Sequence, residues 1–238
     1  MITTEHTFKA FTRELSQLSG AVGQMGELVQ SQLGMVITAI TKRDAALAAL
    51  VDSAEADIHK HEQELSAFSV RMLALRQPVA LDLRSIVAAL KISVDLERIS
   101  DYAASVARRV AELNQVTLDA PMETLVAMAE LVMEMLGEAL EAYRDRDVEH
   151  AAKTWQMDDR IDDLYTNLLC TLRSHMVEDS QRVTACTTLL LVARNLERMG
   201  DHVTNICEHV HFMVSGTPWQ RPEKVSNLVC GESNDCNS

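Results

Sequence analysis

Two pairs of carboxylate side chains occur in the same short motif at two places in the chain. The pattern Leu-Glu-Arg-[Ile/Met]-x-Asp stands at residues 96–101 and returns one hundred residues later at 196–201. Within each copy the Glu and the Asp are four residues apart, so in a helix they lie on one face, where two carboxylates can bind a hard cation. The pairs are Glu97 with Asp101 and Glu197 with Asp201.

Other side chains with oxygen or nitrogen ligands accompany the motifs. Asp158 and Asp162 extend the apolar seam of an earlier predicted helix, and Asn205 continues the stripe of the second motif. Glu55 and His59 occupy the matching places in the first half. Oxygen ligands favour Mg, Mn or iron and a histidine also accepts Zn, so we expect an ion or cluster of one of these metals and no organic cofactor. The predicted metal ligands are Glu97, Asp101, Glu197, Asp201, Asn205, Asp158 and Asp162.

A solvated acidic helix face is the alternative interpretation of these carboxylates. Arg98 and Arg198 each lie three residues before a motif aspartate, a spacing at which intrahelical ion pairs contribute about 0.2–0.5 kcal/mol. A metal-dependent enzyme that activates water is a further alternative, and a metal-free helical scaffold is another. A ferritin-like oxidase needs two Glu-x-x-His motifs, whereas the chain has one, Glu208–His211. We predict no catalytic residues and no enzymatic activity.

Six long helices are predicted to carry these residues. The 238 residues include only 8 glycines and 4 prolines, and 47% of them are hydrophobic. In the third and sixth helices, apolar residues recur in steps of three and four, which is typical of helix bundles; the seams are 92-96-99-103-106-110 and 192-196-199-203-206-210. The predicted helices span about Thr4–Ala46, Leu50–Leu75, Pro78–Leu113, Met122–Arg144, Val148–Met176 and Arg182–Val214.

The repeated motif and the repeated seam together predict an all-α fold of two tandem three-helix bundles. Short connections between the helices favour antiparallel neighbours within each bundle. The first repeat is expected to cover residues 1–115 and the second residues 120–216. Residues 217–238 are poor in apolar side chains, which predicts a disordered C-terminal tail.

Composition limits the partners and the compartment. The net charge of −13 argues against nucleic acid and against adsorption to anionic lipid by bulk charge. The chain has no signal-peptide pattern and no apolar stretch of the roughly 18 residues that would span a bilayer. Its five cysteines form no Cys-x-x-Cys pattern, and we expect Cys170, Cys186 and Cys207 to be buried thiols. A cytoplasmic protein is therefore predicted.

Three longer segments resemble the PhoU family, accessory regulators of phosphate-specific transport. They are Leu75–Arg84, Asp95–Ala103 and Asn195–Glu208, and the resemblance extends to about Gly216. It implies two three-helix bundles side by side, often in a homodimer. It also implies metal clusters in some members on the Glu/Asp-x-x-x-Asp motifs, which match Glu97/Asp101 and Glu197/Asp201 here.

The resemblance further implies a function. Members of the family shut down phosphate uptake and the phosphate-starvation response, so a non-enzymatic negative regulator is expected. The implied partners are the ATPase subunit of the phosphate transporter and the phosphate sensor histidine kinase, which would hold the protein at the inner membrane without insertion. The first copy departs from the family pattern, with Ser100 and Ser105 in place of Gly and Asn. A weaker first metal site is therefore predicted.

Overall fold

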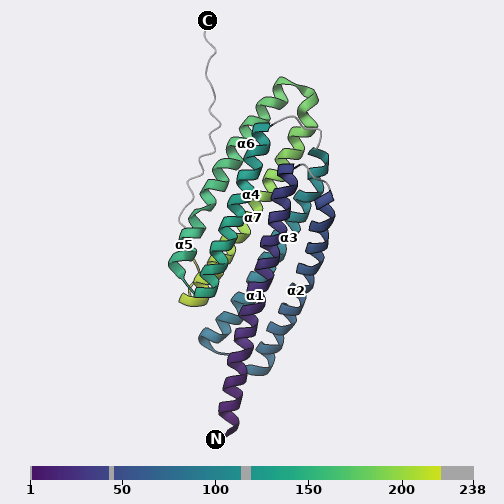
Figure 1. The fold of residues 1–238 in the computed structure, drawn as a ribbon. Coiled ribbons are helices and arrows are strands. Elements are labelled where there is room, and N and C mark those ends of the chain that lie inside the picture. Colours follow the sequence, from purple (N-terminus) through teal and green to yellow (C-terminus); the bar gives the residue numbers. More distant parts are fainter. Residues whose placement is uncertain (1, 43–45, 114–118, 221–238) are drawn as a thin grey trace.

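The protein is built almost entirely of helices. The computed structural model describes residues 2–42, 46–113 and 119–220, and these contain no strand (Figure 1). The all-α prediction is therefore confirmed. The long helices are α1 (Ile2–Lys42), α2 (Ala46–Arg76), α3 (Ala80–Leu113), α4 (Asp119–Asp145), α6 (Asp158–Glu178) and α7 (Val183–Ser215), with the shorter α5 (Val148–Gln156) and a 3-10 turn, η1 (Ser180–Arg182).

The helices form two sets that lie side by side, and in the second set the middle position is shared by the successive helices α5 and α6 (Figure 1). In the first set α1, α2 and α3 all contact one another; in the second, α4 and α7 pack together and both contact α5 and α6. The sets meet through α3 with α7 and through α1 with α4, which leaves α2 on one flank of the molecule and α5 and α6 on the other. Both motifs therefore lie on the two helices that join the repeats.

The predicted apolar seams form the core of each repeat. Leu96 and Leu196 are both fully buried, and so are the other ten seam residues. Burying a leucine of this kind contributes roughly 1.5–3 kcal/mol relative to leaving it in water. Because the seam residues turn inward, the motif carboxylates that follow them along the helix are turned toward its flank. The confirmed seam residues are 92, 96, 99, 103, 106, 110, 192, 196, 199, 203, 206 and 210.

The fifth predicted helix is interrupted, which corrects the expectation of one continuous helix. It breaks at Met157, so that α5 ends at Gln156 and α6 begins at Asp158. Neither glycine nor proline causes the break. The sequence offers only Asp158 and Asp159, and carboxylates are favourable in the first turn of a helix because of the helix dipole. The interruption places Asp158 at the start of a new helix beside α7.

A buried carboxylate joins α3 to α7. Asp95 is only 7% exposed, and its oxygens lie 2.8 Å from His202 Nδ1 and 3.2 Å from His209 Nε2. Burial by itself would raise the pKa of Asp95, but the hydrogen bonds from the two histidines outweigh burial and hold that pKa below its ordinary value. An ionised Asp95 therefore accepts both N–H groups across the boundary between the repeats.

A second polar contact crosses the same boundary at a related place. Asn195, one hundred residues after Asp95, donates from Nδ2 to Ser105 Oγ at 3.1 Å. Asn205, one hundred residues after Ser105, lies with its Nδ2 3.4 Å from Asp95 Oδ1. Position 95 thus faces 205 and position 105 faces 195, which shows that α3 and α7 cross in antiparallel order.

Cysteine placement partly contradicts the sequence-based expectation. Cys186 and Cys207 are buried free thiols, and burial raises the pKa of Cys207 to about 12. Cys170, however, is half-buried and disulfide-bonded, so the prediction of a buried free thiol there is wrong. Within the described ranges, no helix combines the length and the apolar character needed to cross a bilayer.

Candidate metal centre

Four of the predicted ligands of the second repeat lie on α6 and α7 near enough for their charges to affect one another. Glu197 is half-buried on α7, and Asp158 at the start of α6 is only 2% exposed. The pKa of Glu197 is raised, first by burial and then by neighbouring negative charges, with Arg194 opposing. The carboxylates that raise it are Asp201, Asp162 and Asp158. We call these four acidic residues the second-repeat cluster.

Gly200 allows the two helices of this cluster to approach closely. A Cβ atom at Gly200 would lie 2.8 Å from Asp158 Oδ1 and 2.9 Å from Ile161 Cδ1, both shorter than normal contacts. The Asp158 carboxylate therefore packs against the bare backbone of α7, one residue before Asp201. The small residue inside the motif is needed for the helix approach that gathers the acids.

Asn205 lies on a different side of its helix from the expected ligand set. Its Nδ2 is directed to Asp95 on α3, at 3.4 Å, and the residue is half-buried at the junction between the repeats. Residues spaced four apart, such as 197, 201 and 205, each lie about 40° further around the helix. By position 205 this stripe therefore faces α3.

In the first repeat the matching residues are occupied by contacts among themselves. Glu97 Oε1 lies 2.5 Å from His59 Nδ1, and Asp101 pairs with Arg98 at 3.1 Å. The hydrogen bond that His59 donates to Glu97 is the main cause that raises the pKa of His59. These residues are the first-repeat cluster together with Glu55, whose own pKa is raised by burial in the first place.

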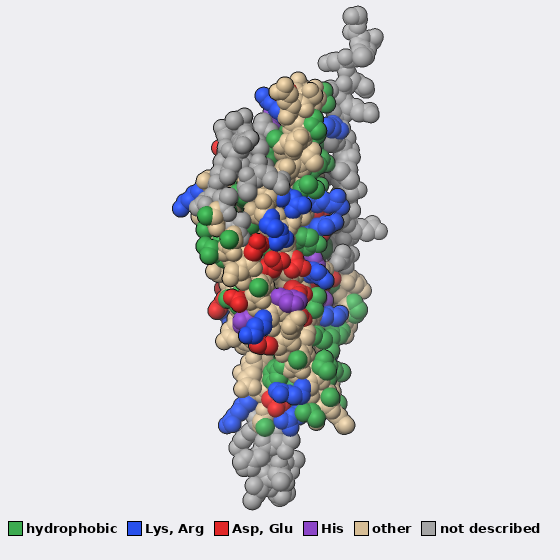
Figure 2. All heavy atoms as spheres, turned by 90° about the vertical axis from the view of Figure 1, so that its right-hand side faces the viewer, with side chains coloured by type: hydrophobic (Ala, Val, Ile, Leu, Met, Phe, Trp, Pro, Cys, Tyr) green, Lys and Arg blue, Asp and Glu red, His purple; other side chains and the backbone are tan. Residues whose placement is uncertain are grey.

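The first-repeat cluster also contains a cation of its own. Arg108 Nη1 lies 2.9 Å from Asp52 Oδ1 and 3.5 Å from Glu55 Oε2. In the second repeat the corresponding residue, one hundred positions later, is Glu208. Figure 2 shows this side of the molecule, with basic and histidine side chains among the acidic ones midway along its length. The first repeat thus balances its carboxylates with a guanidinium, where the second repeat adds a further carboxylate.

Ser100 is a further difference between the two clusters. It is 1% exposed and takes the place that Gly200 has in the second repeat, and its Oγ has no hydrogen-bond partner among the described residues. Glu55, which matches Asp158 in position, is half-buried, whereas Asp158 is buried. A side chain at position 100 is consistent with the greater exposure of Glu55.

The donor chemistry of the second-repeat cluster fits a hard cation. Burial raises the pKa of Glu197, and the charges of the other three carboxylates raise it further. A divalent or ferric ion would relieve the repulsion between these charges, and oxygen donors are the ligands that such ions prefer. In the first repeat, Arg108 and His59 already neutralise part of the negative charge, so the fit there is poorer.

One group of ligand-type side chains was missed in the sequence. His150 Nε2 contacts the Glu138 carboxylate, and with Glu141 the ligand atoms lie within 4.8 Å of one another. The available signal was the Glu-x-x-Glu spacing at the end of α4, followed by a histidine that the Asp147 cap fixes on α5. These side chains are half-buried or exposed, and such surface contacts form without a metal.

One family model matches each half of the chain separately. The family model described as "PhoU domain" matches residues 22–110 and again residues 125–210. The chain belongs to the PhoU family. The match falls on both three-helix sets, so the family resemblance read from the motifs is confirmed, and with it the repeated helical architecture. The relatives are named accessory or regulatory proteins of phosphate transport, which agrees with the prediction of a protein that is not an enzyme.

Individual relatives align along nearly the whole chain. A phosphate-specific transport system accessory protein PhoU homolog from Caulobacter vibrioides is 39% identical over 223 residues, covering 92% of this chain and 97% of the relative. The PhoU protein of Escherichia coli K12 is 30% identical over 233 residues and covers 97% of each chain. The crystal structure of PhoU from Pseudomonas aeruginosa superposes with a TM-score of 0.83 at 34% identity, covering 87% of this chain and all of that one.

Proposed function

We propose that this protein is a negative regulator of phosphate uptake and of phosphate-starvation signalling, and that it acts by binding. The observation that carries the proposal is the family match on both repeats, together with full-length relatives that are phosphate-specific transport system accessory proteins. Binding as the mode of action agrees with a fold of rigid helices whose most unusual surface feature is clustered charge.

The proposed partners are the ATPase subunit of the phosphate transporter and the phosphate sensor histidine kinase. The protein would act in the cytoplasm, as a homodimer, and would reach the inner membrane only through these partners. The net charge of −13 supports partners with a basic docking surface, because opposite charges accelerate the encounter.

An interaction assay tests the regulatory proposal directly. The purified protein is immobilised, and the transporter ATPase and the kinase cytoplasmic domain are passed over it by interferometry at increasing salt. We expect binding to at least one partner, with association slowing as salt rises. Failure of both partners to bind at low salt would remove the proposed mechanism.

We further propose that the second-repeat cluster holds a metal ion or cluster of iron, Zn, Mn or Mg. The raised pKa of Glu197 and the close approach at Gly200 support this assignment. In the first repeat, Glu97 and Asp101 are the weaker candidates, because Arg108 supplies positive charge there. Asn205 is also weaker, since its amide nitrogen is directed to Asp95 and only its oxygen remains for a metal.

Calorimetric titration separates a metal site from a solvated acidic face. Mn²⁺ is titrated into the wild type, into Glu197→Ala/Asp201→Ala, and into the control Asp159→Ala/Asp163→Ala. The control removes the same charge from exposed positions on α6. We expect binding by the wild type and the control and none at this site in the first double variant, with circular dichroism unchanged. Equal binding by all three proteins, or none, would identify the cluster as a solvated face.

A further inference from the structure

We infer that residues Thr217–Gln220, here called the C-terminal strap, position the second-repeat cluster by clamping α5 onto α7. The strap acts through Trp219, which is a positioning residue and not a metal ligand. This inference rests on the proposed metal function and extends it to residues outside the motif.

The strap is the first part of the predicted C-terminal tail, and residues 221–238 lie outside the described residues. It leaves α7 in a defined direction. Gly216 has a φ of 76°, in the left-handed region that favours glycine, and its N–H donates to Phe212 O at 2.9 Å. A Cβ atom there would lie 2.1 Å from Arg84 Nη1, so a larger residue would collide with α3. Thr217 N then donates to Ser215 Oγ at 3.1 Å. The chain reversal is therefore fixed by local contacts, and Trp219 is delivered back over the end of α7.

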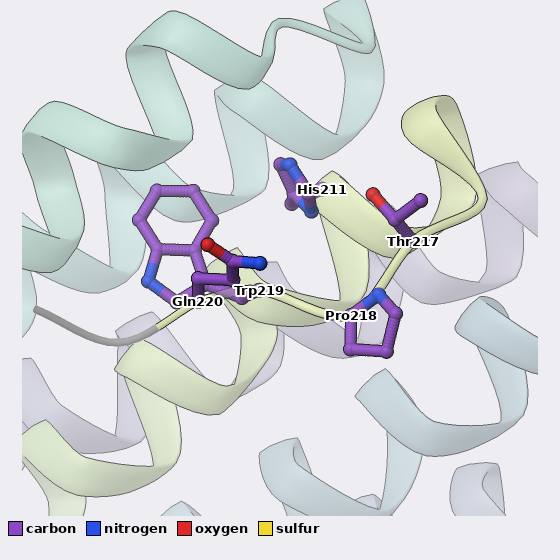
Figure 3. Close-up of a pocket in the computed structure, with 5 residues that line it drawn as sticks. All are labelled: His211, Thr217, Pro218, Trp219 and Gln220. Carbon is purple, nitrogen blue, oxygen red and sulfur yellow. The ribbon is translucent and has the colours of Figure 1, made fainter.

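Trp219 packs between α5 and α7. Its ring lies 5.0 Å from the His211 ring in an edge-on arrangement, and Figure 3 shows the two side chains on neighbouring segments. Its ring also lies 6.0 Å from that of Trp155 on α5. Trp155 is only 5% exposed and directs its Nε1 toward Glu208 Oε1, at 3.4 Å. The strap thus covers the one aromatic side chain of α5 and holds it against α7.

The clamp lies next to the acidic cluster along the chain. Only Gln156 and Met157 separate Trp155 from Asp158, and α5 is a short helix of nine residues. The position of Asp158 against the bare backbone at Gly200 depends on how α5 sits on α7. Loosening Trp155 would move the start of α6 and, with it, the carboxylate that is most deeply buried in the cluster.

The docking of the strap is weak enough that metal binding at the second-repeat cluster could change it. The Nε1 of Trp219 is buried without a hydrogen-bond partner among the described residues, which costs free energy that an ordinary indole contact would not. A cavity of about 620 Å³ remains beside it, lined by strap residues and His211 (Figure 3). Both the clamp and the cluster lie on α7, and α5 is joined to α6 through Met157. A cation that fixes Asp158 should therefore also favour the docked strap, and the coupling must be reciprocal.

The test compares Trp219→Ala, Trp219→Phe and the control Val214→Ala, which alters a partly exposed side chain at the end of α7. Mn²⁺ affinity is measured by calorimetry, and amide hydrogen exchange of α5 is measured without metal. We expect Trp219→Ala to bind Mn²⁺ at least about fivefold more weakly, in the range usual for coupled sites. Its α5 amides should exchange faster, whereas Trp219→Phe and the control should resemble the wild type.

The two proposals fail in different ways. If the wild type binds Mn²⁺ at the cluster and Trp219→Ala binds it equally well, the positioning role is overturned while the metal site stands. If α5 exchange is unchanged in Trp219→Ala, the clamp itself is absent. If the wild type does not bind Mn²⁺, the metal proposal falls and the inference built on it falls with it.

Discussion

At the scale of single residues, Asp95 shows how one buried charge can hold two repeats together. Asp95 lies on α3, and the two histidines that donate to its carboxylate, His202 and His209, lie on α7. Hydrogen bonds to a charged group contribute roughly 1.5–3 kcal/mol, more than neutral ones, provided that all buried partners are satisfied. The same contacts therefore make removal of the carboxylate costly, because two N–H donors lose their acceptor.

We predict that Asp95→Ala lowers the free energy of unfolding by about 1–3 kcal/mol at pH 7, from donors left without an acceptor. Since the pKa of Asp95 is lowered in the folded state, its contribution is present above the ordinary Asp pKa and is lost as the pH falls through the folded value. The difference between variant and wild type should shrink below about pH 4. Urea denaturation measures it, and the exposed Asp159→Ala serves as control.

Glu197 should behave in the opposite way. Its folded pKa is raised, so its ionisation weakens the metal-free protein as the pH rises through that value, while no such cost exists below the ordinary Glu pKa. Without metal at pH 7, Glu197→Gln should be more stable than the wild type by about 0.5 kcal/mol, because water screens a half-exposed group. Thermal denaturation in chelator at pH 4 and pH 7 measures this; a less stable variant at pH 7 would contradict it.

At the scale of helices, the close approach of α6 to α7 decides the geometry of the acidic cluster. Gly200 permits it, and the break at Met157 directs Asp158 into it. Asp158 thereby faces the bare backbone of α7 from the first turn of α6.

Gly200→Ala should reveal this packing. Alanine favours helix by up to about 1 kcal/mol over glycine, yet a Cβ here meets Asp158 and Ile161 at less than 3 Å. We expect a net loss of about 1–2 kcal/mol, within the cost of overpacking. Gly34→Ala is the matched control, because nothing lies within 4 Å of its added Cβ, and it should gain stability. Chemical denaturation of both variants decides; equal gains would mean that α6 shifts freely.

The helices were largely predictable, and their interruptions were not. Seams such as Leu96–Ile99–Ala103 repeat over several turns, and periodicity of this length reports helices and their buried faces. The break at Met157 has no glycine or proline to announce it.

At the scale of the whole molecule, charge is distributed unequally between two similar halves. The first-repeat cluster contains Arg108 bound to Asp52 and Glu55, whereas Glu208 stands at the corresponding position of the second. The sequence placed the acids of both clusters correctly on their helices. It could not show that Arg108 reaches α2 or that Asn205 turns to Asp95, because both depend on how separate helices pack.

Removing the internal cation should make the first repeat a better metal site. We predict that Arg108→Gln raises the Mn²⁺ stoichiometry toward two per chain, since Glu55 would no longer have the guanidinium beside it. Without metal, the same variant should be slightly less stable. Calorimetry and metal analysis after dialysis give the stoichiometry, with the exposed Arg173→Gln as control. An unchanged stoichiometry would show that Ser100, and not Arg108, limits the site.

The antiparallel crossing of α3 and α7 has a consequence for how such a chain can evolve. In a homodimer of identical single repeats this interface would be isologous, so every contact would occur twice and a residue near the axis would face its own copy. Fusion of the copies removes that constraint. Tyr102 now faces His202, with ring centroids 5.8 Å apart, and the acid at position 95 has an amide as its counterpart at 195. The fused chain therefore needs only one buried charge at this interface, with its partners on the other repeat. A symmetric homodimer would have to bury that charge twice.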